Sequence, residues 1–148
     1  MIFREAQTSD IPQIQVVRNA VKENTLSNPA LVTDKDCEEF LTVRGKGWVC
    51  EMDNLVVGFA IADLVKNNIW ALFVTPEKEG KGIGKKLHDI MLNWYFSKTA
   101  TTVWLGTGAN TKAVLFYNKR GWKQTGIQPN GEIRFEMTID EWQKINSI

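Results

Sequence analysis

The order of hydrophobic and polar positions divides the N-terminal part of the chain into one short strand and two helices. Ile2 to Ala6 is typical of a strand. Apolar residues then recur at helical spacing, which predicts a helix to about Glu23 and an irregular loop over Asn24–Val32. A second helix is expected to begin at a capping box formed by Thr33 and Asp36 and to stop at the glycines that follow position 44.

The middle of the chain is extended. Two-residue turns rich in Asn separate three apolar segments, and such short connections predict an antiparallel meander. The three segments are Trp48–Glu51, Leu55–Val65 and Ile69–Thr75.

Helices and strands alternate in the C-terminal half. After Pro76, a glycine-rich loop opens a helix with one apolar face, formed by Ile83, Leu87, Ile90, Met91 and Trp94. The later elements are a strand at Thr102–Thr107, a helix at Thr111–Arg120, and strands at Trp122–Gly126 and Ile133–Ile139. This order predicts an α+β fold, with a mixed sheet of about six or seven strands and helices on both faces. The strand–helix–strand unit around Gly82 should be parallel and right-handed.

Composition narrows the function classes. The 148 residues suit one domain spanning 1–148, and a net charge of +1 gives no general field for nucleic acid or a membrane surface. The longest apolar stretches fall far short of the roughly 20 residues of a membrane span, and the N-terminus has no signal-peptide pattern. Cys37 and Cys50 have no metal-site spacing, so we expect no metal, and free buried thiols in a cytoplasmic protein.

The segment from Leu72 to Leu87 gives the clearest indication of a binding site. It passes from a strand through a loop to a helix start, and three glycines alternate within it, Gly80, Gly82 and Gly84. A helix start exposes unpaired N–H groups with a partial positive charge, and glycines let a phosphate approach them. Four nearby lysines add positive charge: Lys78, Lys81, Lys85 and Lys86. The local prediction is a site for a diphosphate or phosphate ester; a flexible surface turn is the alternative.

Two well-known phosphate loops do not match this segment. Glu79 and Lys86 stand where a Walker A loop requires glycine and Ser or Thr. Leu87 stands where a Rossmann loop requires its third glycine. A nucleotide-binding domain is therefore the weakest of the functional hypotheses.

The segment instead resembles the pyrophosphate loop of the GNAT superfamily of N-acetyltransferases. Leu72-x-Val74-x-Pro76 and Gly82-x-Gly84 follow the superfamily's pattern in register, although Glu79 occupies its Arg or Gln position. A second segment, from Asn110 to Trp122, resembles that superfamily's Asn-x-x-Ala-x-x-x-Tyr-x-Lys-x-Gly-Phe motif, with Trp122 in place of Phe.

The resemblance implies a centrally splayed sheet and transfer of an acetyl group from acetyl-coenzyme A to an amine. It implies that the N–H of Leu72, at a bulge, stabilises the developing oxyanion, and that Val74 and Asn110 hold the cofactor arm. It gives Tyr117 the role of general acid for the thiolate. The phosphate site would comprise Lys81, Gly82, Ile83, Gly84 and Lys85.

Simpler structural roles remain open for several of these residues. Tyr117 could be a packing residue of an amphipathic helix, and Asn110 could cap that helix. The lysines could be plain solvated side chains. His88 lies beside the apolar stripe of its helix and is expected to be a surface or structural residue.

The base and the acceptor are not defined by the sequence. Asn67-Asn68-Ile69-Trp70 has no carboxylate where some superfamily members carry a glutamate base, and water-mediated candidates are Asp63, Glu132 and Glu136. The resemblance places the acceptor between Asn24–Val32 and Ile127–Glu132. The acceptor is a small-molecule amine or a protein amino group, and the oligomeric state is open, a homodimer included. The alternative to an enzyme is a non-catalytic module that binds acyl-coenzyme A.

Overall fold

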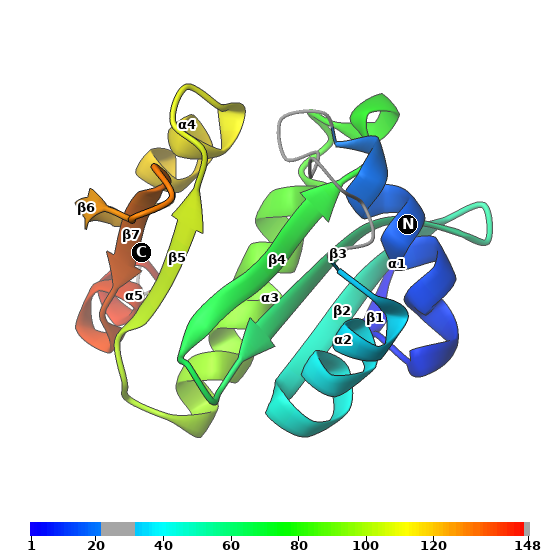
Figure 1. Cartoon of the computed structure of the whole chain (residues 1–148), viewed down its shortest axis with the longest axis horizontal. Helices are drawn as coiled ribbons and strands as arrows, with labels where there is room; N and C mark the ends of the chain where they lie inside the picture. Colours follow the sequence, from blue (N-terminus) through cyan, green and yellow to red (C-terminus); the bar gives the residue numbers. More distant parts are fainter. Residues whose placement is uncertain (22–31, 147–148) are drawn as a thin grey trace.

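The computed structural model describes residues 1–21 and 32–146, which form a mixed seven-stranded sheet between helices (Figure 1). The strand order is β1-β2-β3-β4-β5-β7-β6, and every neighbouring pair is antiparallel except β4 and β5. The strands are β1 (Ile2–Glu5), β2 (Gly45–Met52), β3 (Leu55–Asp63), β4 (Asn68–Val74), β5 (Val103–Thr107), β6 (Lys123–Ile127) and β7 (Ile133–Met137). The predicted mixed sheet, its meander and its parallel pair are confirmed.

Helices cover both faces of the sheet, as the sequence predicts. Their bounds are α1 (Ile11–Ala20), α2 (Asp34–Glu39), α3 (Ile83–Lys98), α4 (Lys112–Lys119) and α5 (Ile139–Asn146). Short segments of other helical types add η1 (Thr8–Asp10), the π-helical η4 (Phe40–Arg44) and η5 (Pro76–Lys78). No helix within residues 1–21 and 32–146 is long and apolar enough to cross a membrane.

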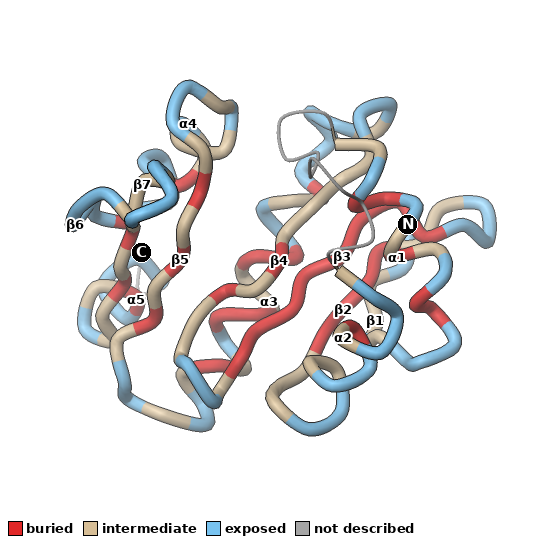
Figure 2. Tube along the Cα trace, in the orientation of Figure 1, coloured by how far each residue is buried: buried red, intermediate tan, exposed pale blue. Residues whose placement is uncertain are grey.

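Each face of the sheet has its own hydrophobic core. Figure 2 shows how the buried residues follow the central strands and α3. The larger core packs α3, α4 and α5 against one face, with Leu87, Met91 and Phe135 fully buried. The smaller core packs α1 and η4 against the other face of β2, β3 and β4. Gly58 on β3 brings α3 close, because an added Cβ there would lie 3.2 Å from side chains of Ile83 and Leu87.

The expected end of the first helix is wrong. The first helix ends at Ala20 instead of about Glu23, because Val21 already has extended backbone angles. Residues 22–31, which hold almost all of the expected Asn24–Val32 loop, lie outside the described residues.

The C-terminal end also differs from the prediction, because β7 stops at Met137 and a helix that the hydrophobic pattern did not reveal follows it. Thr138 and Glu141 form a capping box: the Glu141 N–H donates to the Thr138 hydroxyl oxygen at 3.1 Å, and the Thr138 N–H donates to the Glu141 carboxylate at 2.9 Å. The cap starts α5, which buries Trp142 in the larger core.

Candidate functional site

The sheet opens between its two central strands. β4 and β5 pair at a single position, Asn68 with Trp104, and the N–H of Trp104 donates to the carbonyl of Asn67 at 3.1 Å. Beyond that position β4 pairs only with β3, while β5 pairs with β7. The backbone groups of β4 that face β5 therefore have no ladder partner from Ile69 onward in the part of the chain that the structure describes, and they are available to a ligand.

A bulge in β4 lies where the two strands separate. Ile61 of β3 is opposite Ala71 and Ala62 is opposite Ile69, which leaves Trp70 without a partner residue. As a result two consecutive side chains, those of Trp70 and Ala71, pack into the same core. Such a bulge redirects backbone donors, and Leu72, the expected oxyanion donor, follows it directly.

The glycine-rich loop ends in an uncapped helix start. Gly82 is the N-cap of α3 with φ of 82°, a left-handed conformation that favours glycine, and it has no side chain with which to satisfy the first N–H groups. The first turn of α3 contains no acidic residue that would offset the helix dipole. An added Cβ at Gly80 or Gly82 would meet no atom of a described residue within 4 Å, so these residues leave space for a ligand at the loop.

Three of the expected site segments meet at Gly84. A Cβ at this residue would lie 3.7 Å from Val74 of β4 and 3.7 Å from Phe116 of α4. Leu72 and Val74 both pack against the core that contains Tyr117. The fold thus brings the end of β4, the start of α3 and the middle of α4 together at the opening of the sheet.

Tyr117 is enclosed by aromatic residues, with 6% of its surface exposed. Its ring lies 5.6 Å from that of Trp122 and 5.8 Å from that of Phe135, measured between centroids. Burial raises the pKa of the Tyr117 phenol well above its usual value. The phenol is therefore protonated at neutral pH, which is the state a proton donor requires, and its hydroxyl makes no hydrogen bond to a described residue.

Asn110 does not cap α4. The N-cap is Thr111, and Asn110 precedes it in the left-handed conformation with φ of 64°. Its side chain is exposed and lines a hollow of about 540 Å³, together with Ala109, Thr111, Lys112, Val114, Leu115 and Ile133. The amide of Asn110 is therefore available to a ligand at the C-terminal end of β5.

The charged residues near the loop fall into separate groups. Lys81 and Lys85 are exposed, and Lys85 lies 3.8 Å from the carboxylate of Asp89 one helical turn later. Lys86 points elsewhere, over the ring of Phe3. Glu79, the departure from the superfamily pattern, forms an ion pair of 3.3 Å with Lys112 at the start of α4. That pair joins the glycine-rich loop to α4 and partly neutralises the carboxylate.

The carboxylates considered as bases have other partners. Both oxygens of Asp63 bond to Arg44, at 3.3 and 2.8 Å, and one also accepts from the N–H of Val65 at 2.8 Å. Glu136 accepts from Arg134 at 3.0 Å. The carboxylate of Glu132, at the turn before β7, accepts a hydrogen bond from Asn130 alone among the described residues, and it reaches over Gly106 of β5.

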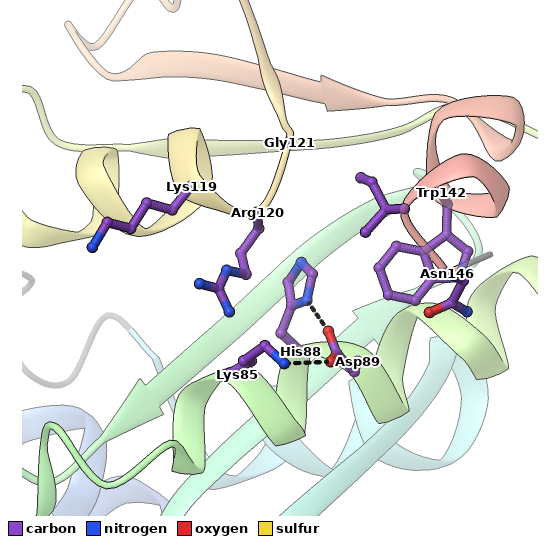
Figure 3. A pocket seen from close by; sticks show the side chains of 9 residues that line it. Lys85, His88, Asp89, Lys119, Arg120, Gly121, Trp142 and Asn146 are labelled. Atoms are coloured by element: carbon purple, nitrogen blue, oxygen red, sulfur yellow. Dashed lines mark hydrogen bonds and ion pairs between the residues drawn. The ribbon is translucent and has the colours of Figure 1, made fainter. Parts of the chain in front are cut away.

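His88 is buried and structural, with 1% of its surface exposed. Its Nε2 accepts from the indole N–H of Trp122 at 2.9 Å, and its Nδ1 bonds the carboxylate of Asp89 at 2.9 Å. Burial lowers the pKa of His88, and the indole contact requires Nε2 to be unprotonated. A cavity of about 450 Å³ lies beside it between α3, α4 and α5, with Lys119 and Arg120 on its rim (Figure 3).

Two buried polar groups were not singled out from the sequence. Arg18 on α1 is 8% exposed, and within residues 1–21 and 32–146 its Nε and Nη2 have no hydrogen-bond partner. The side-chain oxygen of Asn68, at the junction of β4 and β5, is also buried and accepts no hydrogen bond from a described residue. The helical spacing from Ile11 and Ile14 gave one signal for Arg18, since position 18 falls on the same face.

Comparisons with known structures agree with this architecture. The protein smu.2055 of Streptococcus mutans UA159 superposes with a TM-score of 0.79 at 20% identity, over 93% of this chain and 99% of its own. A PaiA N-acetyltransferase of Thermoplasma acidophilum, solved in complex with coenzyme A, gives 0.79 at 16% identity, over 93% and 98%. A ribosomal-protein-alanine N-acetyltransferase of Brucella melitensis gives 0.76 at 20% identity, over 94% and 100%. At these identities the superpositions show the fold alone.

Sequence comparison supplies the family. No protein of curated function matches the chain. The family model for the acetyltransferase (GNAT) family matches residues 14–122, a span that contains the bulged strand, the glycine-rich loop, Asn110 and Tyr117. The chain therefore belongs to the GNAT family of acetyltransferases, and the expected family and splayed α+β fold are confirmed.

Proposed function

We propose that this chain is a single-domain, cytoplasmic N-acetyltransferase that moves an acetyl group from acetyl-coenzyme A to an amine by direct attack. The observation that carries the proposal is the opening between β4 and β5, which leaves the backbone of β4 unpaired directly before an uncapped helix start. Family membership supports acyl transfer in general.

The residues present suit the diphosphate of acetyl-coenzyme A. The backbone N–H groups of Ile83, Gly84 and Lys85 form the first turn of α3 and have no capping side chain. A phosphate is stabilised at such a turn by hydrogen bonds and by the helix dipole. Lys81 and Lys85 add long-range attraction from exposed positions, so the backbone contributes most of the binding and the lysines a smaller, salt-dependent part.

The cofactor arm would then extend along β4 toward Leu72. The unpaired backbone of Val74 and the amide of Asn110 are donors and acceptors for the amides of the pantetheine arm. Acetyl-coenzyme A supplies a thioester whose carbonyl carbon the acceptor amine attacks. The N–H of Leu72 stabilises the negative charge that develops on the carbonyl oxygen, in a site with little water to compete.

Transfer ends with cleavage of the carbon–sulfur bond and protonation of the leaving sulfur. Tyr117 supplies that proton from its buried hydroxyl, which is protonated at neutral pH. The acceptor must attack as a neutral amine and lose a proton to solvent, either directly or through Glu132, the least engaged of the three carboxylates considered. Asn68 cannot take up a proton, but its buried oxygen can accept an N–H of the amine.

The test separates binding from chemistry. Calorimetric titration with acetyl-coenzyme A, with ATP in parallel, measures the first; release of coenzyme A thiol in the presence of amines measures the second. Tyr117→Phe keeps the ring in its aromatic surroundings and removes only the proton donor. We expect its kcat to fall about 10²- to 10⁴-fold with the dissociation constant for acetyl-coenzyme A unchanged.

Phe116→Leu is the matched control, since it alters the neighbouring ring without removing a polar group. A Tyr117→Phe enzyme with wild-type kcat would remove Tyr117 from the mechanism. Binding of acetyl-coenzyme A with no thiol release from any amine would favour the non-catalytic module, for which the absence of a base glutamate and the presence of Glu79 are the arguments. Failure to bind acetyl-coenzyme A at all would refute the enzyme proposal.

A further inference from the structure

Arg18 lies on the buried face of α1, where the other side chains are apolar. The buried residues of α1 are Ile11, Ile14, Val17 and Arg18, which share the face that packs on the sheet. The guanidinium carbon of Arg18 lies 4.8 Å from the ring centroid of Trp70, 5.1 Å from that of Phe73 and 5.8 Å from that of Phe59. Contacts with aromatic faces stabilise a cation, but they leave the N–H groups at its edge without acceptors.

No carboxylate among the described residues pairs with this cation. The ionisable group that acts on it electrostatically among the described residues is the Cys37 thiol, whose pKa is raised by burial, so that thiol is neutral at pH 7. An arginine keeps its proton even when burial lowers its pKa. A buried charge without a hydrogen-bonded partner is unfavourable for folding, and proteins rarely retain one without a ligand to pair with it.

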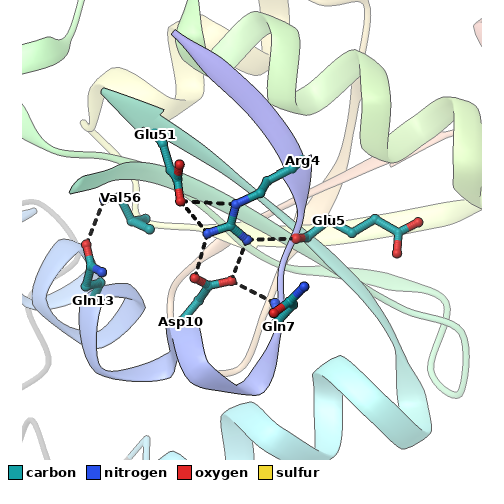
Figure 4. A network of polar contacts seen from close by, with 7 residues as sticks. All are labelled: Arg4, Glu5, Gln7, Asp10, Gln13, Glu51 and Val56. Atoms are coloured by element: carbon teal, nitrogen blue, oxygen red, sulfur yellow. Dashed lines mark hydrogen bonds and ion pairs between the residues drawn. The ribbon is translucent and has the colours of Figure 1, made fainter. Parts of the chain in front are cut away.

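The two donors without partners define the shape of the missing group. Nε and Nη2 lie on one edge of the guanidinium, and their N–H bonds point the same way. In Arg44 the same two atoms, Nε and Nη2, donate to the two carboxylate oxygens of Asp63, at 3.3 and 2.8 Å. Arg4 uses the same edge on Glu51, at 3.1 and 2.5 Å (Figure 4). On Arg18 this edge is buried, and no described residue places a hydrogen-bond acceptor on it.

Arg18 also stands beside the strand that carries the expected oxyanion donor. Its ring contacts include Trp70, the bulge residue, and Phe73, while Leu72 lies between the two on β4. With a strand rise of about 3.3 Å per residue, the backbone positions of these two residues lie roughly 3–7 Å along the strand from Leu72. A small acceptor molecule could therefore place an anionic group at Arg18 and its amine beside Leu72 at the same time.

We infer that Arg18 binds a carboxylate of the acceptor, so that the acceptor is a small amine carrying a carboxylate, that is, an amino acid. This inference rests on the proposed acetyl transfer and names its substrate class. It favours a small molecule over a protein amino group, because an amino group at a chain terminus or on a lysine is followed by an amide rather than by a carboxylate. The carboxylate would pair with Nε and Nη2 side-on, while its amine reaches the thioester beside Leu72.

The test compares amino acids with their α-amides in the thiol-release assay. An amide keeps the amine and the side chain and loses only the carboxylate. The measured quantity is the ratio of kcat/KM for acid over amide, determined for the wild type and for Arg18→Met. Comparing the two enzymes cancels the difference in amine basicity between acid and amide. We expect the ratio to fall about 10- to 100-fold in Arg18→Met, each factor of ten corresponding to about 1.4 kcal/mol.

Two further variants keep the result interpretable. Lys46→Met removes the same charge from a lysine that lies over the Trp94 ring on the other face of the sheet, and it should leave the ratio unchanged. Arg18→Lys keeps the charge without the fork and should recover only part of the preference. Arg18→Met should unfold at the wild-type temperature or above, because it removes an unpaired buried charge, so a loss of preference would not reflect unfolding.

Several outcomes would overturn the inference. An acid-to-amide ratio that Arg18→Met does not change would do so, as would acetylation confined to amines without a carboxylate or to peptide N-termini. An Arg18-dependent preference for phosphoethanolamine would show that the group is a phosphate and would also overturn it. The inference would also be refuted if no amino acid in a panel is acetylated and none raises the melting temperature of the acetyl-coenzyme A complex. None of these results would contradict the proposed function, which is refuted by a different result, the failure of acetyl-coenzyme A to bind.

Discussion

Replacing Gly84 by alanine should stabilise the protein and weaken its binding of acetyl-coenzyme A. Gly84 is the second residue of α3 and is not among the glycines with positive φ. The added Cβ would lie 3.7 Å from Val74 and from Phe116, which is ordinary van der Waals contact. The fold therefore accepts alanine, and the gain comes from lower entropy of the unfolded chain, about 0.4–1 kcal/mol.

For a chain of 148 residues that gain corresponds to a rise of roughly 1–4 °C in melting temperature. Ligand binding should change in the opposite direction. A phosphate oxygen bonds a backbone N–H at about 2.9 Å, and a methyl group beside that N–H obstructs the approach. We expect the dissociation constant for acetyl-coenzyme A to rise at least about tenfold, or about 1.4 kcal/mol.

Circular-dichroism melts and calorimetric titration measure the two effects on one preparation. Gly82→Ala is the contrasting variant, since φ of 82° strains any L-residue by about 1–2 kcal/mol and should lower the melting temperature. Wild-type affinity in Gly84→Ala would show that no phosphate approaches this turn. A lower melting temperature in Gly84→Ala would show that the contact with Phe116 is tighter than the structure has it.

Two further predictions concern charge. Glu79→Gln restores a residue of the superfamily pattern and removes a carboxylate near the phosphate site, so affinity for acetyl-coenzyme A should rise about two- to fivefold at low salt. The exposed pair with Lys112 contributes little to stability, and unfolding in urea should not change; affinity equal to or below that of the wild type would contradict the phosphate site. Burial lowers the pKa of His88, the single histidine of the chain, so below about pH 6.5 the unfolded state takes up a proton that the folded state does not. The free energy of unfolding should therefore fall by up to about 1.4 kcal/mol per pH unit below pH 6.5, and this slope should vanish in His88→Gln; an equal slope in both proteins would show that other groups cause it.

Residues that act through their near neighbours in sequence were predicted well. The capping box of Thr33 and Asp36 forms as expected, with hydrogen bonds of 3.1 and 3.0 Å. The glycine-rich loop and the helix behind it also follow the pattern, because the turn conformation at Gly82 and the unpaired N–H groups of α3 depend on a few adjacent residues. The start of α5 also depends on near neighbours in sequence, and the capping box of Thr138 and Glu141 could have revealed it.

The sequence by itself therefore determined the order of elements as far as β7, the helix start behind the glycine-rich loop and the family, since each depends on local spacing of residue types. Only the tertiary structure decided which distant groups meet. The separation of β4 from β5, the bulge at Trp70 and the burial of His88 beneath Trp122 depend on packing between elements far apart in the chain. Arg18 is the clearest case, because its spacing marked a buried face, whereas the absence of a counter-ion among the described residues depends on the side chains that surround it.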